Sequence, residues 1–367
     1  MTRTVFPIAA LALAACAQAP RGSSPETAAP IAVGNVRVTP VANGVFAAIR
    51  TEPLSLAVNS NSLFIVNSDH VVVVDAQFTR EATAENIAAL RTITNKPVRY
   101  VVNTHWHDDH VAGNQVYQDS FPGVRFIAHR DTRTDLIEKG RPNRTGQVRG
   151  AGPAADRFAR LLAMGLGGDS TPATPVESAA LSSAVSIIRK YIAENEGYRE
   201  VLPDSLVNRS LTLRDGGRTI ELHWFGRANT RGDIVTWLPK EGVVSTGDLL
   251  VAPIPFAINS YPSEWIHVLD SVKALKPRVI VPGHGPVMRD LSYLDTVQRM
   301  LVTARDAVRS AVAAGMSADS MASTVRLESL RDEVAGQEKW MRTMFGMFYR
   351  RPILARLYEE AKSGSLK

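Results

Sequence analysis

Hydrophobic positions along the chain follow two periods, which separate strand-rich stretches from helix-rich ones. Apolar and polar positions alternate in residues 36–75, with many valines and isoleucines, and residues 211–251 form a second β-rich stretch. Alternation with a period of two is typical of β-strands. Residues 80–94 instead place apolar side chains at helical spacing behind Thr79, a residue type that caps helix N-termini. Strands that alternate with helices predict an α/β sandwich.

Two further stretches are predicted to be helical. Residues 131–210 contain two candidate helices, at 153–166 and 178–195, separated by a linker rich in glycine, serine, threonine and proline. We expect this stretch to be an insertion that lies beside the functional site and shapes it as a lid. Residues 291–367 repeat apolar side chains at helical spacing and are expected to form a C-terminal helical extension.

The N-terminus has the proportions of a signal peptide. In residues 1–16 a positively charged start is followed by a short apolar run, which ends in Leu-Ala-Ala-Cys at residues 13–16. This ending resembles the lipobox of bacterial lipoproteins, so we expect a lipid anchor at Cys16 on the periplasmic side of a membrane. The alternative is a plain secretory signal and a soluble periplasmic protein. Residues 17–35 are rich in alanine, proline and serine and are expected to be a tether.

Composition narrows the chemistry. With 45% hydrophobic residues, the 367-residue chain can bury a sizeable core. Cys16 is the single cysteine, so the folded body has no disulfide, no cysteine nucleophile and no thiolate ligand. The net charge is +6, but the basic residues are scattered, which argues against a nucleic-acid partner. We expect a small-molecule substrate, and the sequence leaves the oligomeric state open.

Three of the eight histidines lie within six residues, in the segment His-Trp-His-Asp-Asp-His at residues 105–110. The segment follows a short buried strand predicted at 98–102. His105 and His107, two positions apart on a loop, can hold one cation, and Asp109 and His110 can turn towards a second. Imidazole and carboxylate are donors that suit Zn²⁺.

This segment resembles the HxHxDH signature of the metallo-β-lactamase superfamily, and further matches follow in order. Thr246-Gly247-Asp248 is similar to the family's later aspartate motif, and Pro282-Gly283-His284-Gly285 to its last histidine motif. Asp75, after four valines, is similar to the family's early strand-end aspartate. The resemblance implies an αββα sandwich over residues 36–290, with the helical insertion at 131–210.

The resemblance also implies two metal sites with one or two zinc ions. The second would be formed by Asp109, His110 and His284, with Asp248 beside it. The first would be formed by His105, His107 and residue 229. The family usually has a histidine there, whereas this chain has Asn229, a poorer donor, so we expect a weak or empty first site.

Other polar residues have secondary roles in this interpretation. His223 is a less favoured replacement ligand, because strand alternation places it on the polar face of residues 219–225. Asp75 and Asp108 are expected to hold loops or ligand histidines.

The expected function is a zinc-dependent hydrolase. A metal lowers the pKa of bound water towards about 7, and the metal-bound hydroxide would attack a β-lactam, lactone, ester or thioester carbonyl. Asp109 would orient the water and help to carry its proton. Two alternatives remain: a degenerate member of the family that binds metal or ligand without turnover, and a mononuclear iron dioxygenase acting on persulfides.

Overall fold

The computed structural model describes residues 29–53, 59–215 and 217–366. The predicted signal peptide, Cys16 and most of the predicted tether therefore lie outside the described residues. None of the helices in the described part of the chain has the length and hydropathy that crossing a membrane requires.

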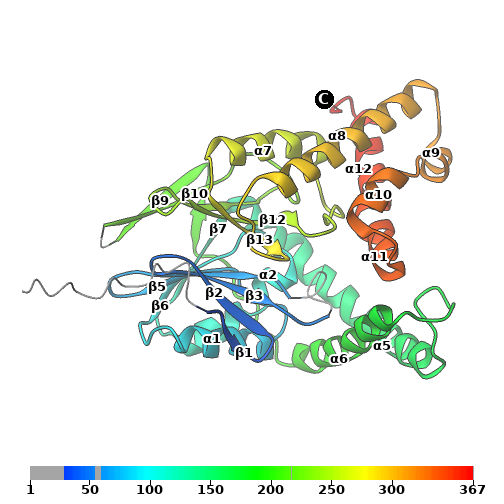
Figure 1. Cartoon of the computed structure of the whole chain (residues 1–367). Helices are drawn as coiled ribbons and strands as arrows, with labels where there is room; N and C mark the ends of the chain where they lie inside the picture. Colours follow the sequence, from blue (N-terminus) through cyan, green and yellow to red (C-terminus); the bar gives the residue numbers. More distant parts are fainter. Residues whose placement is uncertain (1–28, 54–58, 216, 367) are drawn as a thin grey trace, which may run out of the picture.

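The first of two sheets has eight strands, arranged in sequence order (Figure 1). The strands β1 to β4 are antiparallel to their neighbours, and the pairs β5–β6, β6–β7 and β7–β8 are parallel. The short strand β1 pairs with β2 and lies within the predicted tether, which therefore ends earlier than the sequence indicated. The strands are β1 (Ile31–Val33), β2 (Val36–Ala42), β3 (Val45–Arg50), β4 (Ser62–Val66), β5 (Val71–Val74), β6 (Val98–Val102), β7 (Arg125–His129) and β8 (Ser205–Val207).

The second sheet has five strands in the order β13-β12-β11-β10-β9. Its edge pair, β12 and β13, is parallel, and the register shifts near Gly247. The strands are β9 (Ser210–Asp215), β10 (Arg218–His223), β11 (Val235–Leu238), β12 (Val243–Val251) and β13 (Val279–His284).

The two sheets face each other, and helices cover their outer faces, which confirms the αββα sandwich. One apolar cluster joins residues of both sheets, for example Leu63 and Val74 with Ile220 and Val281. A second cluster packs α1 (Arg80–Arg91) and α3 (Asn114–Ser120) on the outside of the first sheet. A third packs α7 (Pro262–Ala274) and α8 (Ser292–Ala313) on the outside of the second.

Residues 130–195 form a helical arm that projects from the sandwich (Figure 1). It contains α4 (Arg130–Asp135), a π-helical turn η2 (Leu136–Gly140), α5 (Arg141–Ala163) and α6 (Pro175–Asn195). The first predicted helix, 153–166, begins twelve residues too late. Proline favours the first turn of a helix, which made Pro153 look like a start, but the structure holds Pro153 inside α5, which packs along α6.

The C-terminal residues are helical and return to the sandwich. α12 packs against α8 on the outside of the second sheet, and η3 belongs to the same apolar cluster, whereas α11 contacts α6 of the helical arm. The elements are α9 (Ala318–Thr324), α10 (Glu328–Ala335), α11 (Lys339–Met344), the π-helical segment η3 (Phe345–Arg350) and α12 (Arg351–Lys362).

Candidate metal centre

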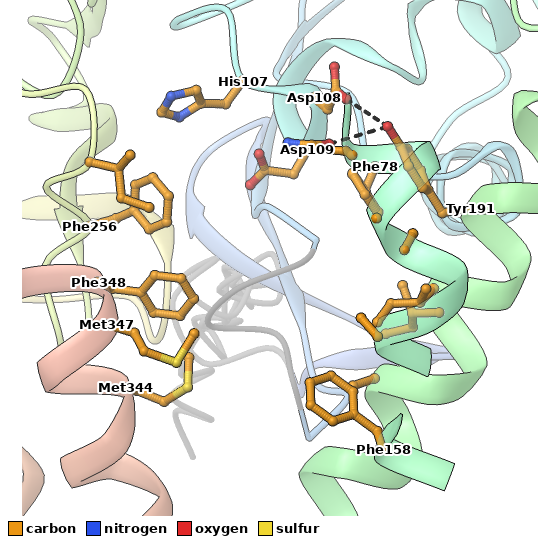
Figure 2. Close-up of a pocket in the computed structure, with 18 of the residues that line it drawn as sticks. Phe78, His107, Asp108, Asp109, Phe158, Tyr191, Phe256, Met344, Met347 and Phe348 are labelled. Atoms are coloured by element: carbon orange, nitrogen blue, oxygen red, sulfur yellow. Dashed lines mark hydrogen bonds between the residues drawn. The ribbon is translucent and has the colours of Figure 1, made fainter. Parts of the chain in front are cut away.

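Three strand ends and the irregular middle of a fourth strand bring the predicted site residues to one edge of the sandwich. Asp75 follows β5, the histidine segment follows β6 and enters the short helix α2 (Asp108–Val111), and His284 ends β13. Asp248 lies in β12, beside the register shift. The residues His107, Asp109, Asp248 and His284 all line a cavity of about 740 Å³ (Figure 2). The sequence-predicted residues therefore meet at one end of a cavity, although they lie up to 179 positions apart in the chain.

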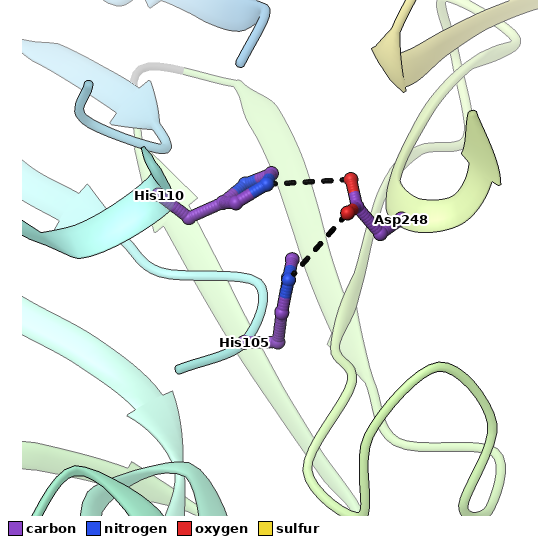
Figure 3. Close-up of side chains that lie close together, drawn as sticks. All are labelled: His105, His110 and Asp248. Atoms are coloured by element: carbon purple, nitrogen blue, oxygen red, sulfur yellow. Dashed lines mark ion pairs between the residues drawn. The ribbon is translucent and has the colours of Figure 1, made fainter. Parts of the chain in front are cut away.

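Two overlapping groups of side chains could each hold a metal ion. Asp109, His110 and His284 form one group, which is the predicted second site. Asp109 Oδ2 lies 2.9 Å from His284 Nε2 and 3.2 Å from His110 Nε2. His105, His110 and Asp248 form the other group (Figure 3), with Asp248 oxygens 3.3 Å from His110 Nε2 and 3.7 Å from His105 Nε2. His110 belongs to both groups, so it lies at the centre of the cluster.

Asp75 fixes the orientation of the central histidine. Its Oδ2 lies 2.8 Å from His110 Nδ1, while its Oδ1 accepts a 2.7 Å hydrogen bond from the Thr104 backbone N–H. An ionised carboxylate only accepts hydrogen bonds, so the proton must be on His110 Nδ1. His110 Nε2 then carries a lone pair that can bind a metal ion, and it faces the carboxylates of Asp109 and Asp248. Asp75 thus contacts the central histidine, and its role in supporting a metal ligand stays a prediction.

The hydrogen bonds around His105 and His107 leave two lone pairs facing each other. The Thr104 hydroxyl donates to Asp75 and therefore accepts from His105 Nδ1, at 3.0 Å. His107 Nε2 donates to Asn259 Oδ1 at 2.9 Å. The remaining ring nitrogens, His105 Nε2 and His107 Nδ1, lie 2.9 Å apart. Two lone pairs at this distance repel each other unless a proton or a cation lies between them.

The electrostatics also favour a cation. Burial lowers the pKa of His110, but the charges of Asp109, Asp75 and Asp248 outweigh it and hold this pKa well above the usual value. Burial, with the neighbouring His110 and His107, holds the pKa of His105 well below its usual value. Within the described residues, His110 Nε2 and Asp248 Oδ1 are buried and make no hydrogen bond. The donor set therefore fits a divalent metal ion bound by imidazole and carboxylate.

Two glycines allow the strands to approach closely enough to form the cluster. A Cβ at position 283 would lie 2.1 Å from Asp248 Oδ1, and one at position 247 would lie 2.6 Å from the Thr104 side chain. Gly247 also has a positive φ of 51°. A side chain at either position would push Asp248 or the histidine segment out of place.

Asn229 is buried in the loop between β10 and β11, at the position that the resemblance gave to a histidine. Its Nδ2 donates to the backbone oxygen of Phe256, and its Oδ1 has no hydrogen-bond partner among the described residues. The Phe256 ring packs 5.5 Å from the His107 ring. The lone pairs of this buried amide oxygen could bind a metal ion. The assignment of Asn229 as a ligand stays a prediction. His223 instead contacts Glu221, with Nε2 3.0 Å from its carboxylate.

Asp108 points away from the metal ligands and joins their loop to the helical arm. Its Oδ1 lies 3.2 Å from the Arg144 guanidinium of α5, and its Oδ2 accepts a hydrogen bond from Tyr191 of α6. Arg144 also lies over the Tyr198 ring, 3.6 Å from its centroid. Burial raises the pKa of Asp108, and Arg144 opposes this shift.

Sequence reasoning identified the ligand histidines but missed several of their partners. Asn259, which holds His107, and Arg144, which holds Asp108, are distant in sequence and belong to no local motif. Among the aromatic residues near the candidate ligands, Phe256 lines the cavity. Trp106 packs in a small buried cluster, and Tyr261 lies against Arg227 and Arg356.

Comparison with known proteins gives the family. A family model described as the metallo-beta-lactamase superfamily matches residues 56–284, and the match ends at His284. A linear primary-alkylsulfatase from Pseudomonas sp. (strain ATCC 19151) is 22% identical over 300 residues, which are 75% of this chain and 51% of that protein. This chain thus spans about half the length of that relative.

Other relatives share the same part of the chain. A metallo-beta-lactamase type 2 from Bacillus sp. (strain 170) is 23% identical over 237 residues, which cover 63% of this chain and 68% of that protein. Among solved structures, the metallo-beta-lactamase FIM-1 from Pseudomonas aeruginosa, in its mono-zinc form, has 17% identity. It aligns with a TM-score of 0.50 and covers 73% of this chain and 96% of that one. This likeness is one of fold.

Proposed function

Because the chain belongs to the metallo-beta-lactamase superfamily, we propose that it is a zinc-dependent hydrolase acting on a carbonyl group of the β-lactam, lactone, ester or thioester class. The observation that carries this proposal is the pair of lone pairs on His105 and His107, 2.9 Å apart, beside the buried donors of His110 and Asp248. This set of donor atoms is suited to a divalent cation.

A metal held by these residues would lower the pKa of a coordinated water from 15.7 to about 7. The chain's own groups then have separate tasks. The Asp109 carboxylate lines the cavity and would accept hydrogen bonds from that water. Burial raises its pKa, but His110 and His284 outweigh this effect and hold the pKa well below the usual value, so the group is ionised. Asp248 adds a second carboxylate at the same end of the cavity. Asp75, Thr104 and Asn259 hold the histidines in place.

Elemental analysis of the purified chain, with a screen of β-lactam, lactone, ester and thioester substrates, tests this proposal. We expect one or two zinc ions per chain and turnover of at least one substrate class. Iron in place of zinc would favour the dioxygenase alternative, and zinc without turnover would favour the degenerate binding protein.

The variant Asp109→Ala should lose bound zinc and lower kcat/KM by more than about a hundredfold, since even residues that merely orient metal ligands contribute 10-fold to 100-fold. Asp156→Ala is the matched control, because its carboxylate is exposed on α5, with Arg189 3.8 Å away. If Asp109→Ala retained both zinc and turnover, the assignment of the site would be wrong.

A sulfate ester is the second candidate substrate, favoured by the similarity to the linear primary-alkylsulfatase over 300 residues. Release of inorganic sulfate from a short alkyl sulfate, compared with hydrolysis of the carbonyl substrates by the same preparation, distinguishes the two. Sulfate release without carbonyl hydrolysis would replace the first candidate with the second.

A further inference from the structure

The cavity beside the metal centre changes character along its length. At one end it is lined by polar side chains, those of His107, Asp109, Asp248, His284 and Asn259. The remaining walls come from the helical arm on one side and from α11 and η3 on the other (Figure 2). Their side chains are predominantly apolar, and include Phe158, Leu181, Ile188, Trp340, Met344 and Met347.

Many of the polar groups in these walls have partners within the chain. Tyr191 donates its hydroxyl to Asp108, and its ring stacks on Phe78 with centroids 4.3 Å apart. Arg157 donates to the backbone oxygen of Gly168. A polar ligand group that bound at this end would lose its hydrogen bonds to water and would form few hydrogen bonds with the protein. Its binding there is therefore unfavourable. The walls therefore favour a hydrocarbon.

The two walls are fixed to each other behind the apolar end. Lys339 Nζ of α11 lies 2.7 Å from Asp169 and 3.1 Å from the buried Glu177 of the helical arm. Thr174 adds a hydrogen bond of 2.8 Å to Glu338. Gly168 and Trp340, which line the cavity, are the chain neighbours of Asp169 and Lys339. These contacts therefore hold the two walls together beside residues that line the cavity.

We propose that this apolar end binds a single hydrocarbon tail of the substrate, with the hydrolysable group at the metal centre. This inference rests on the proposed function and names its substrate class: an amphiphile with a single hydrocarbon tail, which a cavity of about 740 Å³ can enclose. Figure 2 shows the space extending from His107 and Asp109 to Phe158, with Met344 and Met347 on one side. Methionine side chains adapt to the shape of a flexible chain.

The length dependence of hydrolysis tests the inference. For p-nitrophenyl acetate, butyrate and octanoate, kcat/KM should rise about threefold to fourfold for each added methylene, the factor expected from burying one methylene. Binding of sodium octanoate and sodium butyrate, measured by calorimetry, gives the same comparison without turnover. Octanoate should bind about a hundredfold more tightly than butyrate.

Two glycines of α5 give a matched pair of variants. Gly150 lines the cavity, and Gly152, two residues further on the opposite side of the helix, does not. A Cβ at either position meets no atom within 4 Å. Gly150→Phe should fill the cavity and reduce the preference for octanoate over butyrate at least tenfold, whereas Gly152→Phe should keep the wild-type preference. If Gly150→Phe does not fold, Ala154→Phe, one turn further along the cavity wall, takes its place.

The outcomes separate this inference from the proposed function. Octanoate that binds preferentially, with the preference lost in Gly150→Phe but kept in Gly152→Phe, supports the inference even if no ester is hydrolysed, in which case the proposed function alone fails. Ester hydrolysis without length dependence, together with equal binding of the two carboxylates, overturns the inference and leaves the proposed function standing. The same preference in all three proteins would also overturn it, because the tail would then bind elsewhere.

Discussion

The two ends of the cavity are built in different ways. At the polar end, the candidate ligands lie at strand ends or, for Asp248, beside the register shift in β12, and Asp75, Thr104 and Asn259 fix the histidine rings by hydrogen bonds. At the apolar end, the walls are mostly helices from the arm and from the C-terminal extension, held together by the ion pairs of Lys339. The polar end lies within the residues that match the family model, whereas α11 and η3 lie beyond it.

This difference follows from what each end must do. Metal ligands must be held to within a few tenths of an ångström, and strand ends of a buried sheet provide that precision. A hydrocarbon needs volume and an apolar surface, which helices attached to the same sheet can supply with many different sequences. We therefore expect the metal chemistry to depend on the residues carried by the sheets, and the choice of substrate to depend on the helices that line the apolar end.

The largest effect is expected at Arg144, which joins the two regions. Arg144→Met leaves the Asp108 carboxylate buried without its ion-pair partner, and the free energy of unfolding should fall by about 3–5 kcal/mol. Urea denaturation of chelator-treated protein at pH 7.5 measures this loss. Arg189→Met is the control, because Arg189 is exposed on α6 and lies 3.8 Å from Asp156. Equal stability of the two variants would show that the arm is attached by other contacts.

The loss at Arg144 should depend on pH. Burial already raises the pKa of Asp108 in the folded protein, and Arg144 opposes that shift. Removing Arg144 raises this pKa further above its unfolded value, so the variant's folded state binds the proton at a higher pH. Its destabilisation relative to the wild type is therefore full above the raised pKa and decreases as the pH falls through that pKa, until Asp108 is protonated in the folded state of both proteins. A loss that stayed constant between pH 7.5 and 4.5 would contradict the role of Asp108.

A smaller effect is expected at Asp75, within the polar end. In Asp75→Asn the amide N–H₂ can replace the oxygen that faces His110 Nδ1. His110 would then carry its proton on Nε2, the atom that faces the metal position. Loss of such an orienting carboxylate lowers metal affinity about 10-fold to 100-fold.

Competition with a chelating dye at pH 7.5 measures this affinity. Asp69→Asn is the control, because Asp69 precedes the same strand β5 and contacts His70 and Arg99 on the surface. Unchanged zinc affinity in Asp75→Asn would mean that the histidine needs no orienting partner.

The polar and apolar ends of the cavity also differ in how well the sequence predicts them. The strands, the Thr79 N-cap and the histidine segment follow from local patterns, and the structure confirms the cap, whose side chain accepts from the Ala82 N–H. The start of α5 was placed wrongly, because packing against α6 stabilises a helix through Pro153. Asn259 lies 152 residues from His107, and no local period links such positions. The polar end was predictable as a motif, but its supporting contacts and the apolar end were not.

The smallest effect is expected at Asn229, where the polar end departs from its family. In Asn229→His an imidazole replaces a buried amide whose oxygen has no partner in the described part of the chain, so a better donor would face the pair His105 and His107. The variant loses the hydrogen bond from Asn229 to Phe256, which offsets part of the gain. Zinc affinity of the weaker site should therefore rise only about threefold to tenfold. Elemental analysis after mild dialysis should show zinc per chain moving towards two.

Asn229→Ala separates a new ligand from a change in the loop. It breaks the same hydrogen bond to Phe256 without adding a donor, so it should bind no more zinc than the wild type. If both variants gained zinc, the release of the loop would be the cause. If the histidine variant folded and bound zinc as the wild type does, residue 229 would not be a ligand position, and the first site would depend on His105, His107 and Asp248 alone. The polar end would then bind its metal without residue 229, and its candidate ligands would all come from the histidine segment and the second sheet.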